Sequence, residues 1–194
     1  MSVETGHITQ ESSTKTLGFW IYIMTDCVLF GTLFATYAVL HGSTFGGPSS
    51  SQLFDLPYVF IETFLLLTSS FTIGMAVLSA QAGHKSRTIG WLILTFILGL
   101  SFVAMELTEF SHLVADGNSW QRSGFLSAFF TLVGTHGAHI SVGLLWMIVM
   151  TLRIVKGGLK SVDVRRLALL GLFWHFLDII WICIFTIVYL MGVV

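Results

Sequence analysis

Five long apolar segments follow one another along the chain, separated by short polar connectors. Each holds roughly 22 to 28 residues, and at about 1.5 Å per residue a helix of that length crosses a hydrocarbon core of about 30 Å. The fourth is the plainest example, because the thirty residues from Ser123 to Leu152 include no Asp, Glu, Lys or Arg. The pattern predicts transmembrane helices at about residues 18–40, 57–80, 89–110, 124–151 and 167–192.

Outside these segments the chain has little mass. Residues 1–16 are polar, and we expect them to form a tail ahead of a single transmembrane domain over residues 17–194. Hydrophobic residues make up 55% of the sequence and charged residues 10%, against about 25% charged residues in a soluble domain. The predicted fold class is therefore an all-α, polytopic membrane protein, a bundle of five transmembrane helices.

The distribution of basic residues predicts the direction of the helices. Cytoplasmic connectors of membrane proteins carry an excess of Lys and Arg. If the amino terminus lies inside, the outer connectors hold only Arg122. The inner ones then hold Lys15, Lys85, Arg87, Arg153, Lys156, Lys160, Arg165 and Arg166. We expect a cytoplasmic amino terminus and an external carboxyl terminus, in a bacterial plasma membrane or its organellar descendant.

Eight ionisable residues within or at the ends of the predicted helices are the candidate functional residues. In hydrocarbon such a side chain costs several kcal/mol unless it meets a partner, so its presence suggests a role. The eight residues are Asp26, Glu62, Glu106, Glu109, His136, His139, His175 and Asp178. They are candidates for structural hydrogen bonding, for lipid contact or for proton handling.

Depth along the helices divides these residues into two layers. Counting from the predicted helix ends places Glu62, Glu106 and Glu109 near the outer boundary and His136 close to the midplane. The inner half receives Asp26, His139, His175 and Asp178. This separation predicts two local hydrogen-bonded clusters and argues against one continuous proton path through the chain.

The inner residues allow more than one interpretation. His175 and Asp178 are three residues apart and share a helix face with Trp174 and Trp181. They suit a polar clamp between helices better than a proton-active pair or a haem ligand with its orienting carboxylate. Asp26 stands alone on the first helix and needs a histidine partner such as His175 to remain charged. For Asp26 and Glu62 structural hydrogen bonding is favoured over a proton or headgroup role.

Metal and haem sites are poorly supported by the spacing. A carboxylate-bridged di-metal bundle needs two Glu-x-x-His pairs, whereas this chain has one Glu-x-x-Glu and one His-x-x-His. A bis-histidine haem needs ligands from two facing helices, and only His139 with His175 is a plausible pair. We therefore expect no catalytic, cofactor-binding or metal-binding residue in this chain.

Two further patterns concern packing. Small residues recur along one face of the fourth helix, which predicts that another helix approaches it closely and that it is central in the bundle. These residues are Ser127, Thr131, Gly134, Ala138 and Ser141. Aromatic residues near helix ends are typical of anchors at the membrane interface. They include Trp20, Tyr22, Trp91, Trp120 and Tyr189.

Several motifs together resemble subunit III of the haem-copper terminal oxidases. The resemblance runs from about residue 17 to the carboxyl terminus and is nearest to the five-helix quinol-oxidase form, cytochrome o. The motifs are Gly18-Phe19-Trp20-Ile21-Tyr22, Thr25-Asp26-Cys27, Leu33-Phe34-Ala35-Thr36-Tyr37, Glu62-Thr63-Phe64-Leu65-Leu66-Leu67, Gly134-Thr135-His136-Gly137-Ala138-His139 and Trp174-His175-Phe176-Leu177-Asp178-Ile179-Ile180-Trp181.

The resemblance implies a subunit without a catalytic centre, haem or copper. Subunit I of the complex would hold the haem and copper and reduce O2 to water with electrons from ubiquinol, coupled to proton pumping. This chain would contact subunit I directly, join subunits II and IV, bind phospholipid and support assembly and stability. No nucleic-acid partner is expected. Asp26 occupies the position of an embedded carboxylate that is usually Glu in cytochrome c oxidase relatives, and Glu106 stands where they commonly have Gln.

Three alternatives remain open from the sequence. The chain could be a five-helix b-type cytochrome for transmembrane electron transfer, with His139 or His175 as a ligand. It could be subunit III of a cytochrome c oxidase, a related complex that receives its electrons from cytochrome c and not from ubiquinol. It could also be a small carrier of ions or protons.

Overall fold

The structure is a computed structural model that describes residues 2–44 and 56–193, with side chains from 16 to 44 and from 56 to 192. Met1 of the predicted tail and Val194 of the predicted domain lie outside the described residues. The elements, in order, are α1 (Ser2–Leu40), α3 (Leu56–Gln81), α4 (Lys85–Ala115), α5 (Gly124–Gly157), α6 (Ser161–Ile184), the π-helical turn η1 (Phe185–Leu190) and α7 (Met191–Val193).

Five of these helical segments are long and apolar enough to cross a membrane, which confirms the predicted all-α bundle. They are Thr16–Leu40, Leu56–Gln81, Lys85–Ala115, Gly124–Gly157 and Ser161–Leu190. Several extend beyond the predicted ranges at the basic end: α4 begins at Lys85, α5 ends at Gly157 and α6 begins at Ser161. Hydropathy marks where the hydrocarbon ends, whereas Lys and Arg continue a helix into the interface.

Helix ends follow local sequence. Ser123 precedes α5 in an extended conformation, and its Oγ accepts a hydrogen bond of 3.1 Å from the backbone N–H of Leu126. This is an N-cap, which satisfies one of the free donors at a helix start. Gly158 follows α5 with φ of +75°, a backbone conformation that favours glycine, and allows the short turn into α6.

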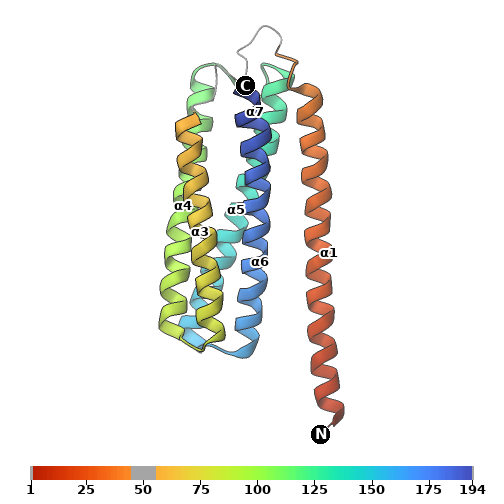
Figure 1. The fold of residues 1–194 in the computed structure, drawn as a ribbon, viewed down its shortest axis with the longest axis vertical. Coiled ribbons are helices and arrows are strands. Elements are labelled where there is room, and N and C mark those ends of the chain that lie inside the picture. The colour runs from red at the N-terminus through yellow and green to blue at the C-terminus, as the bar shows by residue number, and fades with distance from the viewer. Residues whose placement is uncertain (1, 45–55, 194) are drawn as a thin grey trace.

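Helices α3, α4, α5 and α6 pack together, and α1 lies along the α5 and α6 side of this group (Figure 1). The amino end of α1, the α3–α4 turn and the α5–α6 turn lie at one end of the molecule, and the α4–α5 connector and the carboxyl terminus lie at the other (Figure 1). Among the described residues, the arrangement therefore gathers the predicted inner connectors at one end and places the α4–α5 connector at the opposite end.

We expect the fourth span, α5, to be central, and it packs against three helices, α1, α4 and α6, as α6 packs against α1, α3 and α5. More than half (56%) of the most apolar stretch of the last span is buried, against 33% for α5. The small-residue face predicted on α5 is only partly covered, because Thr131 and Ala138 are exposed. The close approaches use other glycines instead, namely Gly137 and Gly143, which are buried and lie outside this face.

Tryptophans of α6 account for much of its packing against the other helices. The ring of Trp174 lies between Gly99 of α4 and Gly143 of α5, where an added Cβ would come within 2.9 and 3.0 Å of it. Its Nε1 donates to Ser69 Oγ of α3 at 2.9 Å. Two turns later, Trp181 Nε1 donates to Thr63 Oγ1 at 3.0 Å. Each ring thus fills apolar space and finds the acceptor that a buried indole needs.

Candidate functional site in the buried polar residues

Three carboxyl groups and a tyrosine form a cluster in the half of the bundle near the carboxyl terminus, called here the acidic cluster. Its members are Glu62 of α3, Glu106 and Glu109 of α4 and Tyr189 of η1. Tyr189 Oη donates to Glu109 Oε2 at 3.0 Å. All three glutamates lie close together in this part of the bundle.

Glycine makes room for one of these carboxyl groups. A Cβ placed on Gly137 of α5 would lie 2.5 Å from both oxygens of Glu106. No other residue could occupy this position without moving the carboxyl group or the helix. The contact of Glu106 with Gly137 thus brings α4 and α5 close together. Glu62 is fully buried, and neither of its carboxyl oxygens has a hydrogen-bond partner among the described residues.

His136 of α5 lies beside aromatic rings. Its ring stacks on Trp181 with centroids 5.3 Å apart and meets Phe102 edge-on at 5.9 Å. It is fully buried, and within the described part of the chain neither ring nitrogen has a hydrogen-bond partner. The surroundings favour a neutral imidazole that packs like an aromatic side chain.

Asp26 of α1 meets His139 of α5, with 3.8 Å between Oδ1 and Nε2. His139 Nδ1 lies 2.7 Å from the carbonyl oxygen of Thr135. A carbonyl only accepts, so Nδ1 carries a proton, and a second proton lies on either Nε2 or the Asp26 carboxyl if the two attract each other. The suggestion of His175 as the partner of Asp26 is wrong, because α1 packs here against the face of α5 that carries His139.

His175 and Asp178 lie at the contact of α6 with α3. Ser70 Oγ of α3 is 2.6 Å from His175 Nδ1, and Asp178 Oδ2 is 4.0 Å from the same nitrogen. Asp178 is buried together with Trp174 and Trp181, whereas nearly half (46%) of the His175 side chain is exposed. The arrangement is that of a polar contact between two helices at the edge of the bundle.

The inner residues therefore form two separate pairs. Asp26 with His139 joins α1 to α5, and His175 with Asp178 joins α6 to α3. His139 and His175 consequently face different helices, which does not fit a shared haem. Among the described residues no group of three or more His, Cys, Asp or Glu side chains has the geometry to hold a metal ion.

Tyr189 is the residue that sequence reasoning missed. Its place near a helix end suggested an interfacial anchor, but the side chain is fully buried and bonds to Glu109. The one sequence feature that could have identified it is the acidic residues at a similar depth, which require a donor. The other proposed anchors behave differently: Trp20 and Trp120 are exposed.

The fold and these contacts define the class: a polytopic membrane protein whose polar residues join its own helices. The family model for cytochrome c oxidase subunit III matches residues 2–193, and the chain belongs to this family of haem-copper oxidase subunits. This membership confirms the resemblance seen in the sequence motifs.

Relatives place the chain more closely within the family. It is 55% identical over 186 residues to cytochrome bo(3) ubiquinol oxidase subunit 3 of Pseudomonas aeruginosa, covering 96% of this chain and 89% of the relative. It is 56% identical over 177 residues to the same subunit of Pseudomonas putida, covering 91% and 86%. Cytochrome c oxidase subunit 3 of Bacillus sp. PS3 is 44% identical over 186 residues, covering 96% and 90%. The chain is a third subunit of the bo3 ubiquinol oxidase type.

Proposed function

We propose that this chain works as the non-catalytic subunit III of a proton-pumping ubiquinol oxidase in the aerobic respiratory chain of a bacterial plasma membrane. Quinol oxidation and reduction of O2 to water take place in subunit I, which holds the haem and copper. The observation that carries the proposal is the match to the family over residues 2–193, together with higher identity to ubiquinol oxidase relatives than to the cytochrome c oxidase relative.

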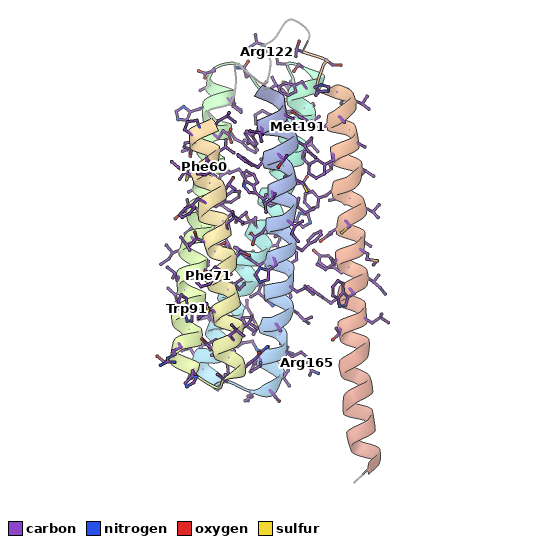
Figure 2. The ribbon with its side chains drawn as sticks, viewed as in Figure 1. Phe60, Phe71, Trp91, Arg122, Arg165 and Met191 are labelled. Atoms are coloured by element: carbon purple, nitrogen blue, oxygen red, sulfur yellow. The ribbon has the colours of Figure 1, made fainter. Side chains whose placement is uncertain are left out.

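The role of the chain in the complex is assembly and stability. It contacts subunit I directly and joins subunits II and IV. Large apolar side chains such as Phe60 and Phe71 point outward from α3 (Figure 2) and suit lipid or another subunit. The exposed small residues Thr131 and Ala138 on α5 support a close approach by a helix of the complex.

The orientation proposed from the sequence agrees with the placement of charge. Arg165 lies at the end that holds the α3–α4 and α5–α6 turns, and Arg122 lies at the opposite end (Figure 2). Lys85, Lys156 and Lys160 flank the same turns as Arg165. We assign this basic end, with the amino terminus, to the cytoplasm.

Buried polar residues serve structure in this proposal, and phospholipid binds between or beside the helices. The contacts Asp26–His139, His175–Ser70 and Tyr189–Glu109 each join two elements far apart in sequence, which supports a role in holding the bundle. The runner-up, a b-type cytochrome, loses support because its two candidate ligands face different helices.

The test is purification of the chain with its partners. The carboxyl terminus carries an affinity tag, the membrane is dissolved in mild detergent, and mass spectrometry identifies stoichiometric partners. We expect a haem-copper subunit I with a quinol-type subunit II and subunit IV. Recovery of the chain alone, or with an unrelated protein, would overturn the proposal.

Haem spectra separate the cytochrome alternative. In the purified complex, His139→Ala and His175→Ala should leave the reduced-minus-oxidised haem bands unchanged per subunit I, while the yield of complex falls. Loss of a haem band in either variant, with subunit I still present, would favour the cytochrome instead.

A further inference from the structure

The contact of α6 with α3 leaves a polar side chain facing out of the bundle. Nearly half (46%) of the His175 side chain is exposed, and its Nδ1 lies 2.6 Å from Ser70 Oγ and 4.0 Å from Asp178 Oδ2. Among the described residues the other ring nitrogen, Nε2, has no hydrogen-bond partner. This nitrogen is therefore open to whatever surrounds the subunit.

His175 lies too deep in the membrane for a lipid headgroup to meet it. It follows Arg166, the last charged residue before it, by nine residues. At about 1.5 Å per residue this is a distance of about 13 Å, close to the middle of a hydrocarbon core of about 30 Å. Toward the other end the span continues to Leu190. An exposed imidazole nitrogen at this depth is unfavourable unless a polar group of another protein segment meets it.

A buried carboxyl group beside His175 is also short of partners. Only 5% of the Asp178 side chain is exposed, and neither of its oxygens makes a hydrogen bond among the described residues. The Ser70 hydroxyl interacts with Asp178 as well as with His175. It has a single proton, so it cannot donate to both at once. Asp178 gains a full donor only if His175 Nδ1 carries a proton of its own and donates to Ser70 Oγ.

The surface around these groups has room for another helix. Gly74 lies one turn from Ser70 on α3, and nothing lies within 4 Å of the position that its Cβ would take. On α6, His175, Ile179 and Ile182 are exposed, with spacings of four and three residues. These five residues are called here the His175 face. A small residue beside a stripe of this spacing admits a second helix at close range.

We infer that the His175 face is the docking site for a transmembrane helix of another oxidase subunit, which donates a hydrogen bond to His175 Nε2 from a hydroxyl or amide side chain. This assignment rests on the proposed function and gives it a contact surface. A donor at Nε2 places the ring proton on Nδ1, which donates to Ser70 Oγ, so the Ser70 hydroxyl proton is free for Asp178. A phospholipid would cover the isoleucines but leave Nε2 unpaired.

The first test identifies the neighbour of this face in the intact complex. p-Benzoylphenylalanine replaces Ile179, whose side chain is 60% exposed, and membranes that contain the whole oxidase are irradiated before they are dissolved. We expect a covalent product with subunit I, II or IV, which mass spectrometry locates within a transmembrane helix of that subunit. Products with lipid alone, with a second copy of this chain or with no protein at all would overturn the inference.

A glycine variant tests the shape of the face. Gly74→Leu fills the open space on α3 without meeting another part of the chain, and it should lower the yield of the covalent product at least tenfold. Gly90→Leu on α4 is the matched control, because nothing lies within 4 Å of that position either. The control should give the unaltered yield, and an equal yield from both variants would contradict the proposed docking.

Histidine variants without the cross-linker test the hydrogen bond. His175→Phe keeps a ring but removes both nitrogens, so the partner subunit should dissociate about threefold faster in mild detergent, the usual effect of one hydrogen bond between membrane helices. His175→Gln retains a polar group and should recover part of this loss. Unchanged dissociation in His175→Phe, or no recovery in His175→Gln, would count against the bond to Nε2.

Failure of this inference is distinct from failure of the proposed function. A complete oxidase complex in which position 179 reacts with lipid alone would contradict the docking site only. Absence of subunit I from the unaltered preparation would contradict the proposed function itself.

Discussion

Helix α1 and the bundle formed by α3, α4, α5 and α6 are held by different kinds of contact. The most apolar stretches of α1 and of the last span are both hydrophobic, with mean hydropathy of 1.7 and 2.1, yet 22% of the first and 56% of the second is buried. Their hydropathy predicts that α1 and the last span both lie in the membrane. Hydropathy does not decide which of the two is buried against other helices, because lipid tails are as apolar as the interior of a bundle.

The difference in burial between α1 and the last span comes from specific side-chain contacts. In the bundle, large side chains pack against glycines and donate hydrogen bonds to hydroxyl groups. Trp174, for example, packs against Gly99 and donates to Ser69 Oγ. On α1 a single stripe is buried, at Ile23, Asp26, Phe30 and Tyr37, with spacings of three, four and seven residues. A stripe of this spacing is a narrow helix seam. We conclude that α1 is attached along one seam, whereas the other helices interlock.

The largest expected effect is that of Trp174→Ala. The change leaves a cavity between α4 and α5 and removes the hydrogen bond to Ser69. We expect a loss of about 3 kcal/mol, toward the lower end for buried aromatics because transfer to lipid adds little. Heating the purified complex and following the release of this subunit measures it. Trp20→Ala on α1, where the side chain is 48% exposed, is the control and should change little. Equal losses would show that α1 interlocks as the bundle does.

Second in size is Gly137→Ala. The new methyl group would meet the Glu106 carboxyl at 2.5 Å, so the helices must separate or the carboxyl must turn. Overpacking of this kind costs about 1 to 3 kcal/mol. Gly31→Ala on α1 is the matched control, since nothing lies within 4 Å of that position. Release of the subunit at a lower temperature in Gly137→Ala alone is the expected result, and equal melting of both variants would contradict it.

The same contrast explains what could be predicted from the sequence. Five spans and the layer of three glutamates follow from hydropathy and depth, which depend on residue type and position alone. Pairing depends on how each helix is rotated, and rotation is set by contacts such as Glu106 against Gly137. The sequence therefore placed Asp26 at the right depth but suggested the wrong histidine, and Tyr189 looked like an anchor when it faces inward.

Tyr189→Phe is expected to have the third-largest effect. It removes the donor to Glu109 Oε2 and leaves a buried carboxyl group short of one partner, which costs about 1 to 2 kcal/mol. Tyr37→Phe on α1 is the matched control, because Tyr37 Oη is 3.5 Å from the carbonyl oxygen of Val188, a distance at which little is lost. Thermal release of the subunit distinguishes them, and a larger effect in Tyr37→Phe would reverse the assignment of stronger contacts to the bundle.

Asp26→Asn is expected to have the smallest effect, under about 1 kcal/mol, although it lies on the α1 seam. The amide keeps the size of the side chain, and its amino group can donate to His139 Nε2 while Nδ1 still donates to Thr135. Attachment of α1 should therefore survive. Retention of the subunit in the purified complex after mild heating, as in the unaltered protein, would show this. Oxygen consumption and proton release, measured together in vesicles, decide whether the pair does more. If proton release stops while oxygen consumption continues, Asp26 handles protons and α1 contributes chemistry that its narrow packing does not reveal.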